Sequence, residues 1–149
     1  MTAPGAEPSK LEVPAPARAL PLVDYDSREF WAAGERGELR IFRCQSCSYY
    51  VHPPVTFCPE CQGREVLPET VSGKGRVVTM TIVRKEFVPG LPVPYVIALV
   101  GLDEQPSVQL PTNIRNCPAD DVFIGMDVKV FFELHGDLWV PFFEPEAQA

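Results

Sequence analysis

Beyond Leu39, apolar and polar residues alternate with a period of two, which predicts strands rather than helices. The longest run, at 75–87, would place Val77, Thr79, Thr81 and Val83 on one face and Val78, Met80 and Ile82 on the other. Other strands are predicted at 39–43, 64–71, 95–102, 107–110, 127–134 and 138–143, with residues 135–137 as a tight hairpin turn between the last two. The pattern therefore predicts a mainly β protein.

One short helix is predicted ahead of these strands, in residues 23–38. Asp26 or Ser27 can cap its N-terminus, and Asp26 with Glu29 resembles a capping box. Gly34 offers a stop. We therefore expect a helix of only a few turns that precedes the β structure.

Four of the five cysteines form two closely spaced pairs, which predicts a metal site. The segment reads Cys44-Gln-Ser-Cys47, ten further residues, then Cys58-Pro-Glu-Cys61. Two intervening residues let both sulfurs of a pair approach one ion at about 2.3 Å, and two pairs complete a tetrahedral shell of thiolates. Because four thiolates leave no position for a substrate or water, we predict structural zinc. Iron in the same shell, as in a rubredoxin, is the alternative.

Two other residues, one of them between the cysteine pairs, could also have a chemical role. His52 lies between the cysteine pairs and is expected to be an ordinary polar residue of the ribbon loop. Cys117 stands alone and is expected to be a partly buried thiol. Ser48 and Gln62 follow the two pairs, at positions where rubredoxins usually carry glycine.

These elements divide the chain into four predicted parts. The proline- and alanine-rich residues 1–22 are expected to form a flexible arm or linker, 23–38 the helix, 39–70 the zinc ribbon and 71–149 the second β domain. That second domain contains five predicted strands, of which the first is long. This arrangement is typical of a small closed barrel of the OB type, and a small open sandwich is the main alternative.

Composition narrows the class of protein. The chain is 46% hydrophobic and 22% charged, as is normal for a soluble globular protein. It has no apolar stretch of the roughly 18 residues needed to span a bilayer and no signal-peptide pattern, so we expect a cytoplasmic protein without a membrane segment. The net charge of −7 opposes binding to nucleic acid, because phosphates attract basic surfaces.

Little catalytic chemistry remains once four cysteines are assigned to the metal. SGKG at 72–75 opens a strand rather than a helix, so it lacks the helix N-terminus on which phosphate loops depend. We therefore expect no independent catalytic activity. An acyl-CoA hydrolase or a small redox carrier that acts alone remains an alternative.

Two apolar features could bind another protein. The segment FVPGLPVP at 87–94 joins two predicted strands and is both apolar and stiffened by three prolines. It would either fold over the end of the barrel or form a preorganised docking surface. The adjacent aromatic residues of the helix would likewise anchor it to the barrel or to a partner. The candidate partner-binding residues are Phe30, Trp31, Phe87, Val88, Leu91 and Val93.

The order of these segments resembles the zinc-ribbon and OB-fold proteins associated with acyl-CoA metabolism, a family long catalogued as a domain of unknown function. The matching segments are Phe30-Trp31, the ribbon with Pro53-Pro54, and residues 72–83, 94–104, 124–133 and 141–146. The resemblance implies an N-terminal helix, a rubredoxin-like zinc ribbon and a C-terminal OB barrel. The sequence departs from the family at Ser48, where a glycine commonly follows the first cysteine pair.

The resemblance also implies a role. Members of this family typically act as non-catalytic partners of thiolase-fold enzymes, where they bridge subunits or help to hold acyl-CoA. Some are fused to, or act beside, MaoC-type hydratases and the thiolase-like aldolases of steroid side-chain degradation. We therefore expect an accessory subunit of a hetero-oligomer that meets acyl-CoA indirectly, with the steroid aldolase as the preferred setting.

Two further hypotheses concern ligands of the barrel. The candidate contacts to CoA phosphates are Lys74, Arg76, Arg84 and Lys85, with solvated surface charge as the alternative. The alternative function is a single-stranded nucleic-acid-binding OB fold. In that case Phe42, Tyr49, Phe131 and Trp139 would stack on bases.

Overall fold

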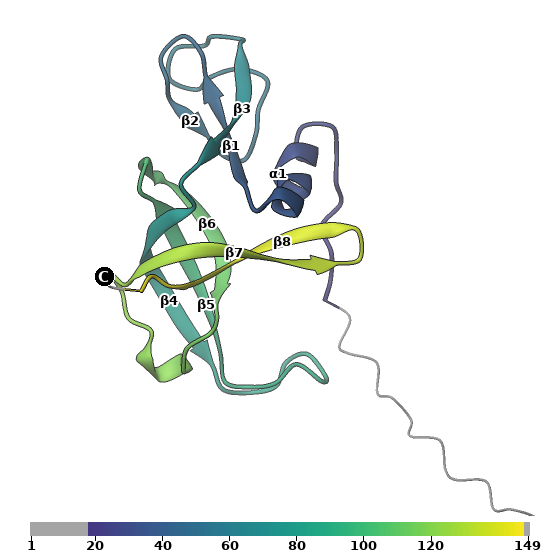
Figure 1. Ribbon diagram of the computed structural model, residues 1–149, viewed down its shortest axis with the longest axis vertical. Helices are drawn as coiled ribbons and strands as arrows, with labels where there is room; N and C mark the ends of the chain where they lie inside the picture. Colours follow the sequence, from purple (N-terminus) through teal and green to yellow (C-terminus); the bar gives the residue numbers. More distant parts are fainter. Residues whose placement is uncertain (1–17, 148–149) are drawn as a thin grey trace, which may run out of the picture.

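The computed structural model describes residues 18–147, which form a small three-stranded sheet, a five-stranded barrel and a short helical segment that packs against both (Figure 1). The elements are α1 (Arg28–Ala32), the 3-10 turn η1 (Ala33–Arg36), β1 (Leu39–Cys44), β2 (Tyr50–Val51), β3 (Val66–Val71), β4 (Lys74–Val83), β5 (Tyr95–Leu102), β6 (Gln105–Ile114), the 3-10 turn η2 (Ala119–Asp121), β7 (Asp127–His135) and β8 (Leu138–Pro145). The predicted fold class, a mainly β chain with a short helix, a ribbon and an OB-type barrel, is confirmed.

The barrel closes in the order β4-β5-β6-β8-β7, which decides against the open sandwich. Neighbouring strands pair antiparallel everywhere except between β6 and β8. Those two strands run parallel and share one register pair, Ile114 with Phe143. The seam between β6 and β8 is therefore the most weakly paired part of the barrel.

The long first strand of the barrel does not keep one alternation along its length. A β-bulge between Val77 and Thr79 shifts the register against β5. Val77 is buried on one side of the bulge, whereas Met80 and Ile82 pack against the core on the other. The predicted grouping of Val77 with Thr79, Thr81 and Val83 on one face is therefore wrong, because an extra residue exchanges the two faces.

Strand boundaries differ most from the prediction in three places. β4 ends at Val83 rather than at residue 87, and the residues after it form an exposed loop. β6 covers Gln105–Ile114 instead of 107–110, although it contains Pro106 and Pro111. β2 was not predicted because its two residues are too few to show a period.

Side-chain contacts attach the ribbon to the barrel and to the helix. The Gln105 amide accepts a hydrogen bond from Tyr50 N–H and donates one to Tyr50 C=O, both at 2.9 Å, so it pairs with β2 as a strand would. Arg40 of β1 forms an ion pair with Glu29 of α1 and donates to the Pro68 carbonyl, again at 2.9 Å in each case.

The helical segment is bounded by residues other than those predicted. Ser27 is the N-cap, but its hydroxyl donates to the Asp24 carboxylate at 2.6 Å and does not cap α1. The predicted capping box with Asp26 is therefore wrong. The segment ends at Gly37, with a left-handed φ of 71°, and not at Gly34.

One continuous core links the helix, the base of the ribbon and the barrel. Phe30 of α1 and Leu39 of β1 belong to the same buried cluster as the barrel side chains. Gly34 allows the close approach, because a Cβ there would lie 2.5 Å from Trp139 Cβ and 2.6 Å from Phe132 Cδ1. Within residues 18–147, no helix has the length and apolar character required to cross a membrane.

We expect Gly34→Ala to lower the free energy of unfolding by about 1–3 kcal/mol, because the added methyl group overlaps two side chains of the β7–β8 hairpin. Urea unfolding of the zinc-loaded chain would measure the change. Gly37→Asn is the matched control, since its position is open and asparagine tolerates a positive φ. Equal stability of Gly34→Ala and the unchanged chain would contradict this packing.

Candidate functional site

The four paired cysteines converge at the tip of the ribbon. Their sulfur atoms all lie within 4.8 Å of one another. Cys44 Sγ is 3.6 Å from Cys61 Sγ, and Cys47 Sγ is 3.6 Å from Cys58 Sγ. A tetrahedral zinc with sulfur at about 2.3 Å requires sulfur–sulfur distances of about 3.8 Å. The four side chains therefore fit a zinc ion.

The two cysteine turns repeat one hydrogen-bond pattern. Ser48 N–H donates to Cys44 C=O and Gln62 N–H donates to Cys58 C=O, both at 2.9 Å. In the first turn, hydrogen bonds from the backbone N–H groups of Cys47 and then Ser46 lower the pKa of the Cys44 thiol to about 6. Backbone donors that favour a thiolate suit a metal ligand.

Both cysteine turns contain a non-glycine residue in the left-handed region. The φ of Ser48 is 67° and that of Gln62 is 59°. These residues follow the two cysteine pairs directly, where rubredoxins usually carry glycine. Both turns thus keep the left-handed geometry without the usual glycine. A non-glycine residue is strained in this conformation, so the folded state loses some stability. Four thiolates fill the coordination shell, so the zinc supplies structure and leaves no open position for substrate.

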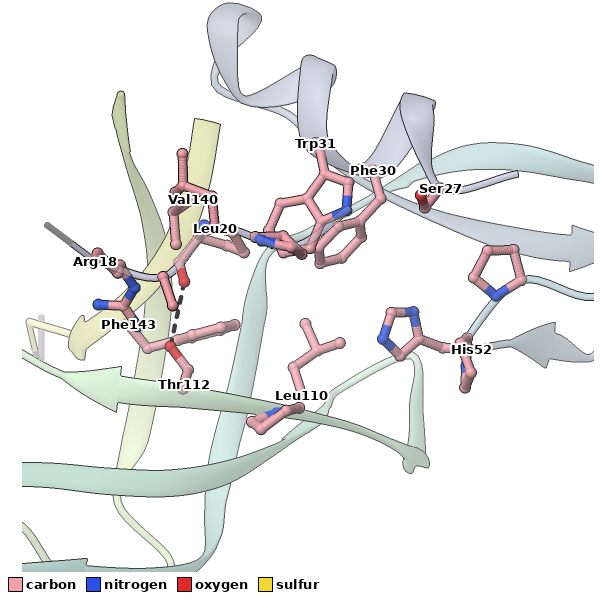
Figure 2. Close-up of a pocket in the computed structure, with 16 residues that line it drawn as sticks. Arg18, Leu20, Ser27, Phe30, Trp31, His52, Leu110, Thr112, Val140 and Phe143 are labelled. Carbon is pink, nitrogen blue, oxygen red and sulfur yellow. Dashed lines mark hydrogen bonds between the residues drawn. The ribbon is translucent and has the colours of Figure 1, made fainter. Parts of the chain in front are cut away.

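A second candidate site is a cavity of about 570 Å³ between α1, the loop after β2 and the seam of the barrel (Figure 2). Its wall is mostly apolar. The principal apolar side chains are Leu20, Phe30, Trp31, Leu110, Val140 and Phe143. This volume lies within the range of about 300–1,000 Å³ that is usual for ligand sites.

The weak pairing of β6 with β8 creates this cavity. Pro111 of β6 and Pro141 of β8 line it, and neither has an N–H to contribute to a ladder. Thr112 Oγ donates to Pro141 C=O at 3.3 Å, so a side chain bridges the strands here (Figure 2). The strands separate beyond the register pair of Ile114 and Phe143, and α1 covers the gap.

His52 closes one end of the cavity and adds no charge to it. Its ring lies 5.3 Å from the ring of Phe30. Burial lowers the pKa of His52, so the imidazole is neutral at pH 7. The expectation that His52 is an ordinary polar residue of the ribbon loop is refined, because the structure places it against the helix.

The predicted partner-binding residues fall into two groups. Phe30 is 8% exposed and already belongs to the core, whereas Trp31 is partly exposed and lines the cavity. Phe87, Val88 and Val93 are 72%, 46% and 37% exposed. Their loop therefore does not bury these side chains over the barrel.

Leu91 is the one predicted partner-binding residue of that loop that is partly buried. Leu91 N–H donates to Val88 C=O at 3.1 Å, and Gly90 N–H donates to the Glu86 carboxylate at 2.9 Å. These bonds fold the loop on itself and restrict its backbone.

The four predicted contacts to CoA phosphates do not form one cluster. Lys74, Arg76 and Arg84 each form an ion pair with a carboxylate of the barrel domain, and Lys85 Nζ lies 6.0 Å from the ring of Phe87. The first two are at the start of β4 and the last two follow its end, so about 30 Å of strand separates the pairs.

Sequence reasoning did not identify the cavity, because its residues come from distant segments. Arg18, Leu110 and Phe143 carry no shared motif. The available signal was the presence of Pro111 and Pro141 within strand patterns, since proline in a strand marks interrupted pairing.

Two family descriptions match consecutive parts of the chain. "ChsH2, rubredoxin-like zinc ribbon domain" matches residues 31–66, and "ChsH2, C-terminal OB-fold domain" matches residues 68–133. The division between the two matches falls at residue 67.

Three curated proteins are similar to parts of the chain. A "Probable enoyl-CoA hydratase alpha subunit" of Thermomonospora curvata is 31% identical over 133 residues, which is 89% of this chain and 41% of that protein. The 3-oxo-4,17-pregnadiene-20-carboxyl-CoA hydratase alpha subunit of Mycobacterium tuberculosis is 33% identical over 129 residues, with coverages of 87% and 40%. A DUF35 domain-containing scaffold protein of Methanocaldococcus jannaschii is 35% identical over 94 residues, with coverages of 60% and 64%.

The chain thus spans about two fifths of the hydratase subunits and somewhat under two thirds of the scaffold protein. It is also similar to a chain of the solved structure of the Ltp2-ChsH2(DUF35) aldolase. That match has a TM-score of 0.76 and 30% identity, and it covers 85% of this chain and 98% of the other.

We expect Cys58→Ser to abolish stoichiometric zinc binding, because three thiolates and a hydroxyl bind zinc far more weakly than four thiolates. Metal analysis of the purified chain would measure the zinc content. Hydrogen exchange should show lost protection in β1–β3. Cys117→Ser, which changes the cysteine outside the cluster, should keep one zinc per chain. Full zinc content in Cys58→Ser would contradict the assignment.

We expect Ser48→Gly to stabilise the zinc-loaded chain by about 1 kcal/mol, because glycine adopts the positive φ without steric cost. The urea midpoint at an unchanged m-value would report the gain. Ser46→Gly is the control in the same turn, at a position that does not have a positive φ, and it should give no stabilisation. Equal effects of the two variants would count against a strained turn.

Proposed function

We propose that this chain is a non-catalytic accessory subunit of a thiolase-fold enzyme that acts on acyl-CoA thioesters. The chain belongs to the ChsH2 (DUF35) family of zinc-ribbon and OB-fold proteins. The observation that carries this proposal is the match to a chain of the Ltp2-ChsH2(DUF35) aldolase, which this chain covers over 98% of its length. The scaffold designation of an archaeal relative agrees with an accessory role.

The preferred setting is the retro-aldolase of steroid side-chain degradation, in which the acyl-CoA substrate is met through the partner. Similarity to a hydratase alpha subunit named for a pregnadiene carboxyl-CoA supports this setting. A MaoC-type hydratase is a second proposed neighbour in the assembly. The nucleic-acid alternative finds no support among these relatives, and the net charge of −7 opposes it.

The loop between β4 and β5 is the surface we propose for the thiolase-fold partner. It projects from the end of the barrel opposite the ribbon (Figure 1). Phe87, Val88 and Val93 expose apolar surface there, and burial of such surface contributes about 25 cal/mol per Å². Because internal hydrogen bonds already order the loop, little conformational entropy would be lost on docking.

Charge at the base of this loop suggests how acyl-CoA could reach the assembly. Arg84 and Lys85 directly precede the apolar residues. Arg84 is paired with Asp120, whereas Lys85 is in no ion pair among residues 18–147. We propose that Lys85 is the most available of the four cations for a CoA phosphate at the edge of the interface.

We expect Phe87→Ser combined with Val88→Ser to weaken association with the thiolase-fold protein encoded by a neighbouring gene at least tenfold, because central apolar anchors dominate interface energetics. Co-expression followed by size-exclusion chromatography with light scattering would detect the complex. An aldol-cleavage assay would report its activity.

Phe123→Ser is the matched control, since Phe123 is 58% exposed on the loop before β7. It should leave the complex intact. If the unchanged chain does not associate and the enzyme is fully active alone, the accessory role is wrong. If Phe123→Ser and the double variant weaken the complex equally, the proposed surface is wrong and the role stands.

A further inference from the structure

The cavity between the helix and the barrel seam has a single charged side chain in its wall. Among the described residues that line it, Arg18 is the only cation and none is acidic. His52, which lies at the opposite end of the cavity from Arg18, is neutral (Figure 2). A ligand that filled this space would therefore meet apolar surface along its body and one guanidinium at one end.

Arg18 is held in place without a carboxylate partner among residues 18–147. Its Nη2 donates to Asn113 Oδ1 at 3.1 Å, and its guanidinium carbon lies 4.9 Å from the centre of the Phe142 ring. Leu20, two residues later, packs against the hairpin turn at Gly136. These contacts position the guanidinium at the rim of the cavity while several of its donors stay available.

A second arginine makes the surroundings of Arg18 more positive. Arg115 also lies over the Phe142 ring, at 4.7 Å, and forms an ion pair with Glu133. His135 Nε2 is 3.5 Å from the same carboxylate. Arg18 and Arg115 thus share the Phe142 ring, while the Glu133 carboxylate is paired with Arg115.

The electrostatic consequence is visible on Arg18 itself. Although its side chain reaches solvent, partial burial of the guanidinium and the charge of Arg115 lower the pKa of Arg18, and Glu133 compensates only in part. An anion placed beside Arg18 would relieve the repulsion between the two cations. The cluster is therefore short of negative charge at the mouth of an apolar cavity.

We propose that this cavity is a binding site for an amphipathic carboxylate, with its chain or ring system among Trp31, Leu110 and Phe143 and its carboxylate on Arg18. A planar carboxylate matches the two parallel donors of a guanidinium. The cavity volume of 570 Å³ accommodates a medium-chain acid. The site belongs to the isolated chain, so it does not depend on any partner enzyme.

Calorimetric titration of the zinc-loaded full-length chain with decanoate and with decanol tests the proposal. We expect saturable binding of decanoate at one site and at least tenfold weaker binding of decanol, which lacks the charge. Arg18→Gln should weaken decanoate at least tenfold and leave decanol unchanged. Trp31→Ala, which removes apolar wall, should weaken both ligands.

Arg28→Gln is the matched control, because Arg28 also lies over an aromatic ring, that of Tyr25, but does not line the cavity. It should bind decanoate as the unchanged chain does. Equal affinity for decanoate and decanol, equal losses in Arg18→Gln and Arg28→Gln, or no saturable binding would each overturn the proposal. None of these outcomes bears on the partner complex, which is measured with a second protein.

Discussion

The convergence of four thiolates on one point is the constraint on which the N-terminal half of this protein depends. The ribbon has about thirty residues. Chains shorter than roughly 40 residues bury too little apolar surface to be stable by packing alone, so metal binding supplies the missing free energy. The consequences extend beyond the metal. β1 runs from Cys44 back to Leu39 and Ile41, which lie in the core shared with the barrel, and β2 leads directly into His52. The metal therefore also fixes one wall of the cavity.

The barrel contributes the complementary constraint through an incomplete seam. β6 and β8 meet at one register pair and then diverge where each contains a proline. Because β6 and β8 do not pair beyond this point, the apolar side chains between them would be exposed if nothing covered them. Gly34 lets η1 approach the β7–β8 hairpin closely, and α1 thereby brings Phe30 and Trp31 over the opening. A weak seam and a close helix together produce a half-open, mostly apolar cavity between the helix and the barrel.

Three regions with different physical roles thus occupy one small chain. The zinc site is saturated by protein ligands and acts on stability alone. The β4–β5 loop is stiff, apolar and exposed, as suits association with another protein. The cavity is apolar with one cation at its rim, as suits a small ligand. Most of the ion pairs join side chains that are substantially exposed, and such pairs contribute little to stability, so they do not compete with these three features in shaping the fold.

Local patterns in the sequence determined the features that depend on neighbouring residues. The spacing of the cysteine pairs predicted the metal centre, and the period of two predicted most strands, because both are set within a few residues. The apolar loop at 87–94 was likewise recognisable from its composition. Features that depend on distant residues were decided by the tertiary structure. The bulge after Val77, the two-residue strand β2 and the extension of β6 through Pro111 exist because neighbouring strands hold them there. The cavity joins Arg18, the helix, His52 and both sides of the seam, and only closure of the barrel brings these segments together, since side-chain contacts between distant segments leave no period in the sequence.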